Sequence, residues 1–204
     1  MSISLAKGQG ISLAKKDGGS LTKIRLGVGW DAAKPKSGGG FMSRMFGGAS
    51  SGSTANIDLD ASCVMFDANN KQRDEVWFGK PGMRSNCGSV THSGDNLTGD
   101  GDGDDEVISV DLSRVPRDVD TLVFTVQSFR GQTFNEVDNA YARLVDDSKD
   151  EEVARYTISE SGSHTGVIMA KVSRRTGEWR IEAIGAPANG RTIHDIAKNI
   201  QAIL

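Results

Sequence analysis

The sequence contains only two cysteines and no long run of apolar residues. Cys63 and Cys87 are too few for a disulfide framework, so we expect both to be reduced thiols. Without a long apolar run no transmembrane segment is expected, and the alternating N-terminal residues lack the apolar stretch of a secretory signal. These absences favour a cytoplasmic protein.

Basic charge and catalytic motifs are also scarce. The 24 Lys and Arg residues are outnumbered by 27 Asp and Glu residues, so the net charge is −3 and nothing indicates nucleic-acid binding. The sequence has no nucleophile elbow, phosphate-binding loop or zinc-ligand spacing. We interpret each of the three histidines, His92, His164 and His194, as structural or solvated. The sequence therefore favours a binding protein over an enzyme.

The pattern of short apolar segments predicts a mostly β fold. A chain of 204 residues with 37% hydrophobic content suits one domain, which we assign to residues 1–204. Short strands separated by Gly, Asn and Asp turns are typical of an antiparallel β-sandwich. One short C-terminal helix is predicted, with Thr192 as N-cap and Asp195 three residues later. We expect strands at residues 3–5, 11–13, 21–28, 57–66, 75–78, 90–92, 106–112, 122–128, 140–145, 153–157, 165–172 and 179–183.

The most informative segment is an acidic stretch between residues 95 and 106. It has alternating glycines and no Lys or Arg, and its carboxylates are Asp95, Asp100, Asp102, Asp104, Asp105 and Glu106. Neighbouring like charges repel by about 1 kcal/mol per pair even in water. A divalent cation would remove that repulsion, and oxygen-only ligands are typical of a hard ion such as calcium or magnesium. A solvated acidic loop without a ligand is the alternative.

The acidic stretch is not an EF-hand. Asp100, Asp102 and Asp104 fit the first, third and fifth positions of that loop, but the sixth position requires glycine and is Asp105. The residues that follow alternate as in a strand. A second acidic pair, Asp58 and Asp60, lies on one face at the start of a predicted strand, where a shared cation or exposure to water would relieve the repulsion.

Residues 34–56 interrupt the strand pattern with many glycines and serines, and we interpret them as a flexible insertion. Within the insertion, the apolar and basic hexapeptide Phe41–Phe46 is either an anchor for a partner or membrane surface, or a segment that folds back onto its own domain.

Four segments together resemble the TerD family of tellurium-resistance and stress proteins, over nearly the full chain. They are Gly27–Asp31, Ile57–Ser62, His92–Glu106 and Gln132–Ala140. The stretch Ser128–Asn135 and the insertion after Trp30 and Asp31 are most similar to the TerZ-type members. The resemblance implies a calcium-binding β-sandwich in the bacterial response to tellurite, other chemical stress or phage. It also implies partners, namely other tellurium-resistance or stress proteins in an assembly near the membrane, with peripheral membrane association.

The same resemblance nominates calcium ligands. They are Asp58, Asp60, Asp95, Asn96, Asp100, Asp102, Asp104, Asp105 and Glu106, with Asn135 or Asn139 as neutral oxygen donors and Asp31 as a further candidate. Because one calcium ion takes about six to eight oxygens, this supply could serve two close ions. Two other functions stay open: a metal-dependent hydrolase that uses the acidic cluster, and a structural protein whose calcium only stabilises the fold.

We predict that limited proteolysis cuts first within residues 34–56, because Gly-Ser chains bury little surface and are entropically costly to order. Mass spectrometry of early fragments identifies the cut. Deleting the segment should leave calcium binding unchanged. First cleavage elsewhere would contradict this prediction.

Overall fold

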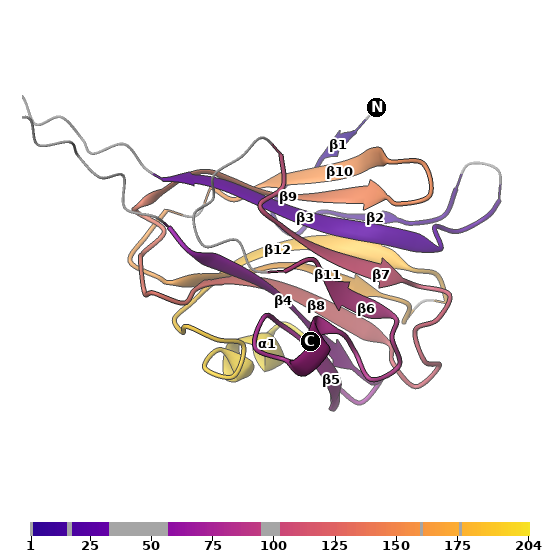
Figure 1. Cartoon of the computed structure of the whole chain (residues 1–204). Helices are drawn as coiled ribbons and strands as arrows, with labels where there is room; N and C mark the ends of the chain where they lie inside the picture. The colour runs from indigo at the N-terminus through magenta and orange to yellow at the C-terminus, as the bar shows by residue number, and fades with distance from the viewer. Residues whose placement is uncertain (1, 16–17, 33–56, 95–102, 160, 176) are drawn as a thin grey trace, which may run out of the picture.

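The computed structural model describes residues 2–15, 18–32, 57–94, 103–159, 161–175 and 177–204. Within these ranges the chain forms two six-stranded sheets, with one short α-helix near the C-terminus (Figure 1). The pairing is antiparallel except between the short β1 and its neighbour β10. The predicted antiparallel β-sandwich with a C-terminal helix is therefore confirmed.

The first sheet has the order β1-β10-β9-β3-β7-β6. Its strands are β1 (Ile3–Ser4), β10 (Glu151–Thr157), β9 (Val137–Asp146), β3 (Lys23–Ala32), β7 (Glu106–Asp111) and β6 (Val90–His92). β7 alternates buried and half-buried residues, and its buried residues Ile108 and Val110 belong to the core. This alternation is the pattern of a strand with one face against the other sheet.

The second sheet has the order β2-β12-β11-β8-β4-β5. Its strands are β2 (Gly10–Ser12), β12 (Arg180–Ala188), β11 (Gly166–Ser173), β8 (Thr121–Ser128), β4 (Leu59–Phe66) and β5 (Gln72–Val76). A 3₁₀ turn, η1 (Pro81–Met83), follows β5. β4 and β8 are buried at every position, so both faces of this sheet are covered at its centre.

A second apolar cluster covers the outer face of the second sheet. Val64, Phe66 and Val123 from the sheet pack there with Ile196 and Ile200 of the C-terminal segment, which contains α1 (Ala197–Ala202). Figure 1 shows α1 on the side of the second sheet that faces away from the first. This cover explains why β4 and β8 carry apolar residues on both faces.

Some predicted boundaries were wrong. β5 ends at Val76 rather than Phe78, and β12 continues to Ala188. The helix begins at Ala197 and not after Thr192, because the Asp195 carboxylate accepts the backbone N–H groups of Arg191 and Thr192 and closes a turn first. The insertion at residues 34–56, including Phe41–Phe46, lies outside the described residues.

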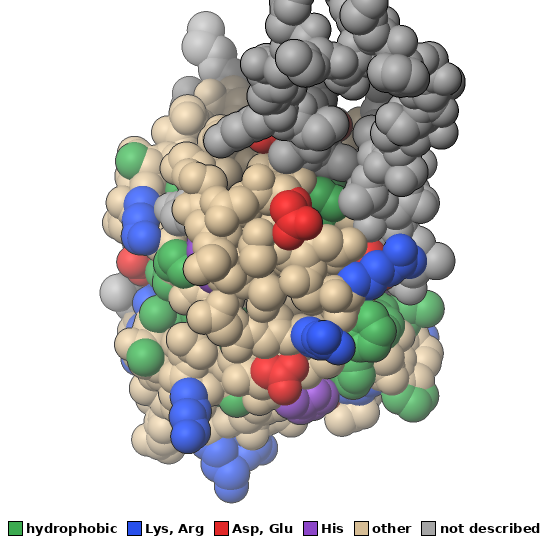
Figure 2. Space-filling view, turned by 90° about the vertical axis from the view of Figure 1, so that its left-hand side faces the viewer, with side chains coloured by type: hydrophobic (Ala, Val, Ile, Leu, Met, Phe, Trp, Pro, Cys, Tyr) green, Lys and Arg blue, Asp and Glu red, His purple; other side chains and the backbone are tan. Residues whose placement is uncertain are grey.

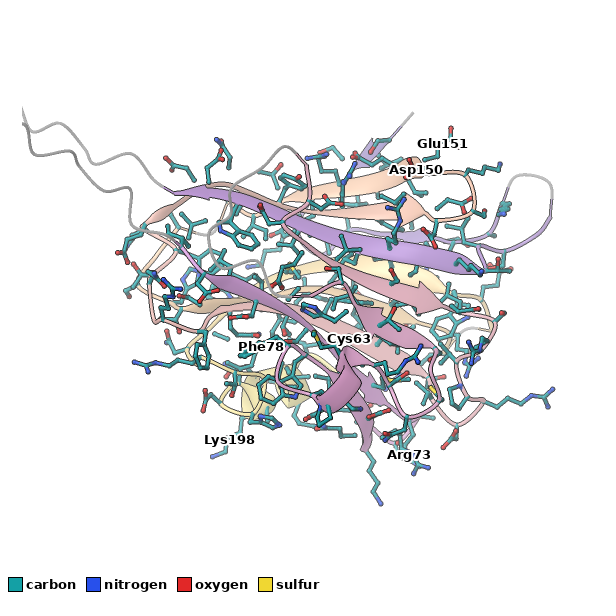
Figure 3. The ribbon with its side chains drawn as sticks, viewed as in Figure 1. Cys63, Arg73, Phe78, Asp150, Glu151 and Lys198 are labelled. Carbon is teal, nitrogen blue, oxygen red and sulfur yellow. The ribbon has the colours of Figure 1, made fainter. Side chains whose placement is uncertain are left out.

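Both cysteines carry free thiols. Cys63, labelled in Figure 3, is fully buried between the sheets, and burial raises the pKa of its thiol so that it stays protonated. Its role is that of a small apolar core residue.

Candidate metal site at one end of the sandwich

Antiparallel pairing gathers most of the predicted ligands at one end of the molecule. β3 ends where β7 and β9 begin, since Val28 pairs with Glu106 and Asp31 with Asp138. In the second sheet β4 begins at the same end, on the left of Figure 1. Figure 2 views this end directly and shows acidic and basic side chains beside one another.

Glu106 lies between the two sheets and is fully buried. Its Oε2 accepts the backbone N–H of Ala61 at 2.6 Å and lies 3.2 Å from Nε2 of the buried His92. The backbone N–H of Gly94 donates to His92 Nδ1 at 3.0 Å, so the proton of the ring lies on Nε2, which faces Glu106 and the Ala61 carbonyl. These contacts connect β7 of the first sheet with β4 of the second.

Asp104 lies on the outer face of the first sheet. Its Oδ1 accepts a hydrogen bond from Arg143 Nε at 2.7 Å and lies 3.4 Å from the Tyr141 hydroxyl. A Cβ at Gly27 would lie 2.0 Å from Asp104 Oδ2, so glycine at this position leaves room for the carboxylate against the strand and a larger residue would displace it. The cation that balances Asp104 comes from β9, which the local sequence of the acidic stretch could not reveal.

Asp105 is held by β3. Its backbone N–H donates to the Val28 carbonyl at 2.8 Å, and its Oδ2 accepts the Trp30 backbone N–H at 2.9 Å. The indole Nε1 of the buried Trp30 donates to the Ile57 carbonyl at 3.0 Å. Trp30, near the end of β3 in the first sheet, thus also holds the residues that lead into β4 of the second sheet.

The charge around Asp105 is strongly negative. Burial raises the pKa of its carboxyl group, the bond from Trp30 opposes that rise, and the nearby charges of Asp31, Asp104 and Glu106 raise the pKa further. Burial and neighbouring negative charge both disfavour the ionised form of the Asp105 carboxyl group, and a bound cation would remove that cost.

Asp58 and Asp60 are buried, so the alternative of a strand end exposed to water is wrong. Their neighbours Ile57, Leu59 and Ala61 belong to the core between the sheets, as the alternation predicted. The two carboxylates therefore point to the opposite, outer face of the second sheet. Asp58 Oδ2 accepts a hydrogen bond from Arg130 Nε at 2.9 Å.

The described carboxylates consequently occupy three layers. Asp104 lies outside the first sheet, Glu106 between the sheets, and Asp58 and Asp60 on the outer face of the second. Packed sheets lie about 10 Å apart, so these groups do not converge on a single point. In keeping with this, no group of three or more His, Cys, Asp or Glu side chains among the described residues is arranged to hold a metal ion.

The remaining candidates lie at the surface or outside the described residues. Asn139, with a left-handed φ of 54°, donates through Nδ2 to Asp31 Oδ2 at 2.7 Å. Asn135 is exposed, and its backbone N–H donates to the Gly162 carbonyl. Four predicted ligands are in ranges that the structure does not describe, namely Asp95, Asn96, Asp100 and Asp102.

Sequence reasoning missed the two arginines at this end. Arg130 follows β8 and contacts Asp58, while Arg143 is on the outer face of β9 and contacts Asp104. The alternation of β9 could have placed Arg143 and Tyr141 on one face. Neither partner carboxylate could have been identified without the strand register.

Two mostly antiparallel sheets, with several carboxylates at one end, define a mostly β sandwich protein with an acidic end. The TerD domain matches residues 1–199 of the chain. Tellurium resistance protein TerZ of Serratia marcescens is 48% identical over 198 residues, which cover 97% of this chain and 96% of that protein. Stress response protein SCP2 of Bacillus subtilis is 43% identical over 204 residues, covering 96% and 98%. The chain therefore belongs to the TerD family.

The fold is also shared with a solved structure. A homologue of telluride resistance protein (TerD) from Streptomyces coelicolor A3(2) superposes with a TM-score of 0.66 at 18% identity, over 89% of this chain and 98% of that one. Neither TerZ nor SCP2 carries the name of an enzyme. In the part of this chain that the structure describes, no helix has the length and apolarity needed to cross a membrane.

We predict that Glu106→Ala lowers the free energy of unfolding by about 1–3 kcal/mol in the presence of a calcium chelator, because the buried Ala61 N–H loses its acceptor. Urea unfolding followed by fluorescence gives the value. Ser109→Ala, on the outward face of the same strand, is the control and should change stability little. Equal effects of the two substitutions would show that Glu106 does not brace the sheets.

Proposed function

We propose that this protein is a calcium-binding module of bacterial tellurite and chemical-stress resistance. It acts by calcium-dependent association with other proteins of the response, near the membrane surface. The observation that carries the proposal is that five carboxylates lie at the same end of the sandwich, although in different layers: Asp58, Asp60, Asp104, Asp105 and Glu106.

The donor chemistry fits calcium. The gathered side chains offer only oxygen ligands, which a hard cation prefers over the sulfur and nitrogen ligands of zinc or copper. Burial together with neighbouring negative charge raises the pKa of Asp105, which is the environment that a cation would relieve. Asp58 and Asp60 would hold one ion, and Asp105 with Glu106 would contribute to another. The bound ion would supply positive charge that neutralises these carboxylates.

Calcium suits this end better than magnesium. Its coordination sphere is large and tolerant of irregular geometry, whereas magnesium requires a tight octahedron and retains water. The carboxylates here come from several strands and already accept protein hydrogen bonds, as Glu106 does from Ala61. Such a donor set is irregular, so selectivity for calcium is part of the proposal.

The module binds and does not catalyse. Names of the relatives refer to tellurium resistance and stress response, and both TerZ and SCP2 align over nearly their whole lengths. Both ring nitrogens of His92, the histidine nearest the carboxylates, already have partners. Its Nε2 contacts Glu106 and the Ala61 carbonyl, and its Nδ1 accepts the Gly94 N–H. It therefore braces the fold and does not serve as a proton carrier for a substrate.

Calcium titration of the purified protein in millimolar magnesium should release or absorb heat. At free calcium about 100 times the dissociation constant, the free energy of unfolding should rise by about 2.7 kcal/mol relative to protein in chelator. Calorimetry and urea unfolding provide the two measurements. Indifference to calcium, or equal binding of magnesium, would refute the metal assignment.

Association with partners should depend on calcium as well. Tagged protein in a lysate of its own host should retain tellurium-resistance or stress proteins in calcium and lose them in chelator. Asp58→Asn with Asp60→Asn should lose them even in calcium, because the ion is no longer held. If partners are retained equally in all three samples while calcium still raises stability, the ion only stabilises the fold.

A further inference from the structure

A series of four aromatic rings runs from the acidic end of the second sheet to the C-terminal segment. Phe129, directly after β8, contacts Phe78 with ring centroids 5.3 Å apart, and Phe78 contacts Trp77 at 5.1 Å. Trp77 in turn contacts the ring of His194 at 5.3 Å. All three contacts are edge-to-face, an arrangement that aromatic rings prefer. We call these four residues the aromatic ladder.

The ladder is anchored in the fold at one end and exposed at the other. Trp77 packs against the apolar cluster on the outer face of the second sheet, and a Cβ at Gly79 would lie 2.4 Å from its ring. Phe78 is half-buried, whereas Phe129 is 45% exposed. Among the described residues, Ile3 is the other exposed large hydrophobic side chain. The fold therefore holds Phe129 at the surface on a rigid support.

Cations flank the aromatic ladder. The guanidinium of Arg191 lies beside Gly131, two residues after Phe129, since a Cβ at Gly131 would be 3.7 Å from Arg191 Nε. Lys198 is exposed on α1, four residues after His194, and Figure 3 shows it on the same side of the molecule as Phe78. In the part of the chain that the structure describes, neither Arg191 nor Lys198 forms an ion pair.

The carboxylates beside the ladder are engaged by protein groups. Glu75 Oε1 lies 2.9 Å from Nε2 of His194. The Asp195 carboxylate accepts the backbone N–H groups of Arg191 and Thr192. Figure 2 shows hydrophobic and basic side chains next to one another on one flank of this end. This flank therefore offers an exposed aromatic ring together with positive charge.

We propose that the aromatic ladder and its flanking cations dock this protein on an anionic membrane surface, with the Phe129 ring inserted among the lipid headgroups. The inference deepens the proposed function, and it rests on that function for its calcium dependence. It identifies the side of the molecule that meets the membrane.

The size of the exposed ladder favours a lipid surface over a protein partner. A stable protein interface buries about 800 Å² on each partner. One aromatic side chain buries at most about 250 Å², and here only Phe129 is fully available. Aromatic rings are favoured at the headgroup level of a bilayer, and anionic lipids attract Lys and Arg near the surface. One protruding ring with neighbouring cations suits shallow, reversible attachment.

The neighbouring acidic end makes this attachment depend on calcium. Without a cation, the carboxylates at this end repel an anionic surface. Arg130, next to Phe129 in the chain, donates to Asp58 Oδ2 at 2.9 Å, and its side chain is 46% exposed. Calcium held by Asp58 and Asp60 would neutralise them, and the Arg130 guanidinium would then be available to a lipid headgroup. Binding to anionic vesicles should therefore require calcium.

The experiment measures cosedimentation of the full chain with vesicles of phosphatidylcholine, alone or mixed with phosphatidylserine, in calcium and in chelator. The parent should bind the mixed vesicles in calcium and show little binding in the other three conditions. Phe129→Ala should weaken that binding about tenfold, and Arg191→Gln about fivefold. Ile3→Ala is the control and should bind as the parent does, because Ile3 is 43% exposed but lies on β1, at the edge of the first sheet.

Insertion of the ring gives a second measurement. Vesicles with brominated acyl chains should quench the added fluorescence of Phe129→Trp in calcium and should not quench that of Ile3→Trp. Parent-like binding of Phe129→Ala, or an equal loss in Ile3→Ala, would overturn the docking surface. Loss of stress proteins from a Phe129→Ala pull-down, with no vesicle binding by the parent, would also overturn it and make the ladder a protein interface.

Thermal melts of the same samples separate this inference from the proposed function. If calcium raises the melting temperature of the parent but no vesicles are bound, only the docking surface is wrong. If the parent binds mixed vesicles equally in calcium and chelator and Phe129→Ala does not, the docking surface stands and the calcium dependence of the proposed function is refuted.

Discussion

The buried carboxylate of Glu106 connects the two sheets at the end of the sandwich that carries the candidate ligands. It accepts the Ala61 N–H of the opposite sheet and receives His92 at the same oxygen, in a region where water does not compete. Buried charge-assisted hydrogen bonds are short and directional, so β7 and β4 are fixed relative to each other. Because Asp105 precedes Glu106 and Asp60 precedes Ala61, the same contact sets the positions of the candidate ligands in both sheets.

Arginine side chains balance the carboxylates that face outward. Arg143 accompanies Asp104 on the first sheet and Arg130 accompanies Asp58 on the second, each through Nε. The Arg143 guanidinium also lies near Glu152, whose pKa is lowered to about 2, chiefly by its hydrogen bonds with Arg155. The outer face of the first sheet therefore carries a connected series of opposite charges, whereas the negative charges of Asp31, Asp104 and Glu106 lie near Asp105 and raise its pKa.

The sequence was a good guide to the sandwich and a partial guide to the site. Period-two alternation predicted that Asp58 and Asp60 face away from Ile57 and Leu59, and that is what the strands show. The resemblance to the TerD family was confirmed by the match over residues 1–199. What could not be read from the sequence depends on register between distant strands. Gln127 stands opposite Asp60 and Arg143 beside Asp104 only because β4, β8 and β9 pair as they do.

The start of the C-terminal helix was also predicted wrongly, for a different reason. Thr192 and Asp195 have the residue types of a capping box, and the Asp195 carboxylate does accept the Thr192 N–H. The carboxylate also accepts the Arg191 N–H, so the segment forms a turn, and the helix begins only at Ala197. Burial of Ile196 and Ile200 against the sheet then decides where the helix lies, which local signals do not encode.

Trp30 has a consequence for how this chain can vary in length. Its indole Nε1 donates to the Ile57 carbonyl while its backbone N–H is bound by Asp105, so residues 30 and 57 are fastened together beside the acidic end. Once the two ends of a connection are joined, doubling its length adds only about 0.6 kcal/mol of closure entropy. The crossing from β3 to β4 can therefore gain or lose many residues by insertion and deletion, while the sandwich on either side keeps its geometry.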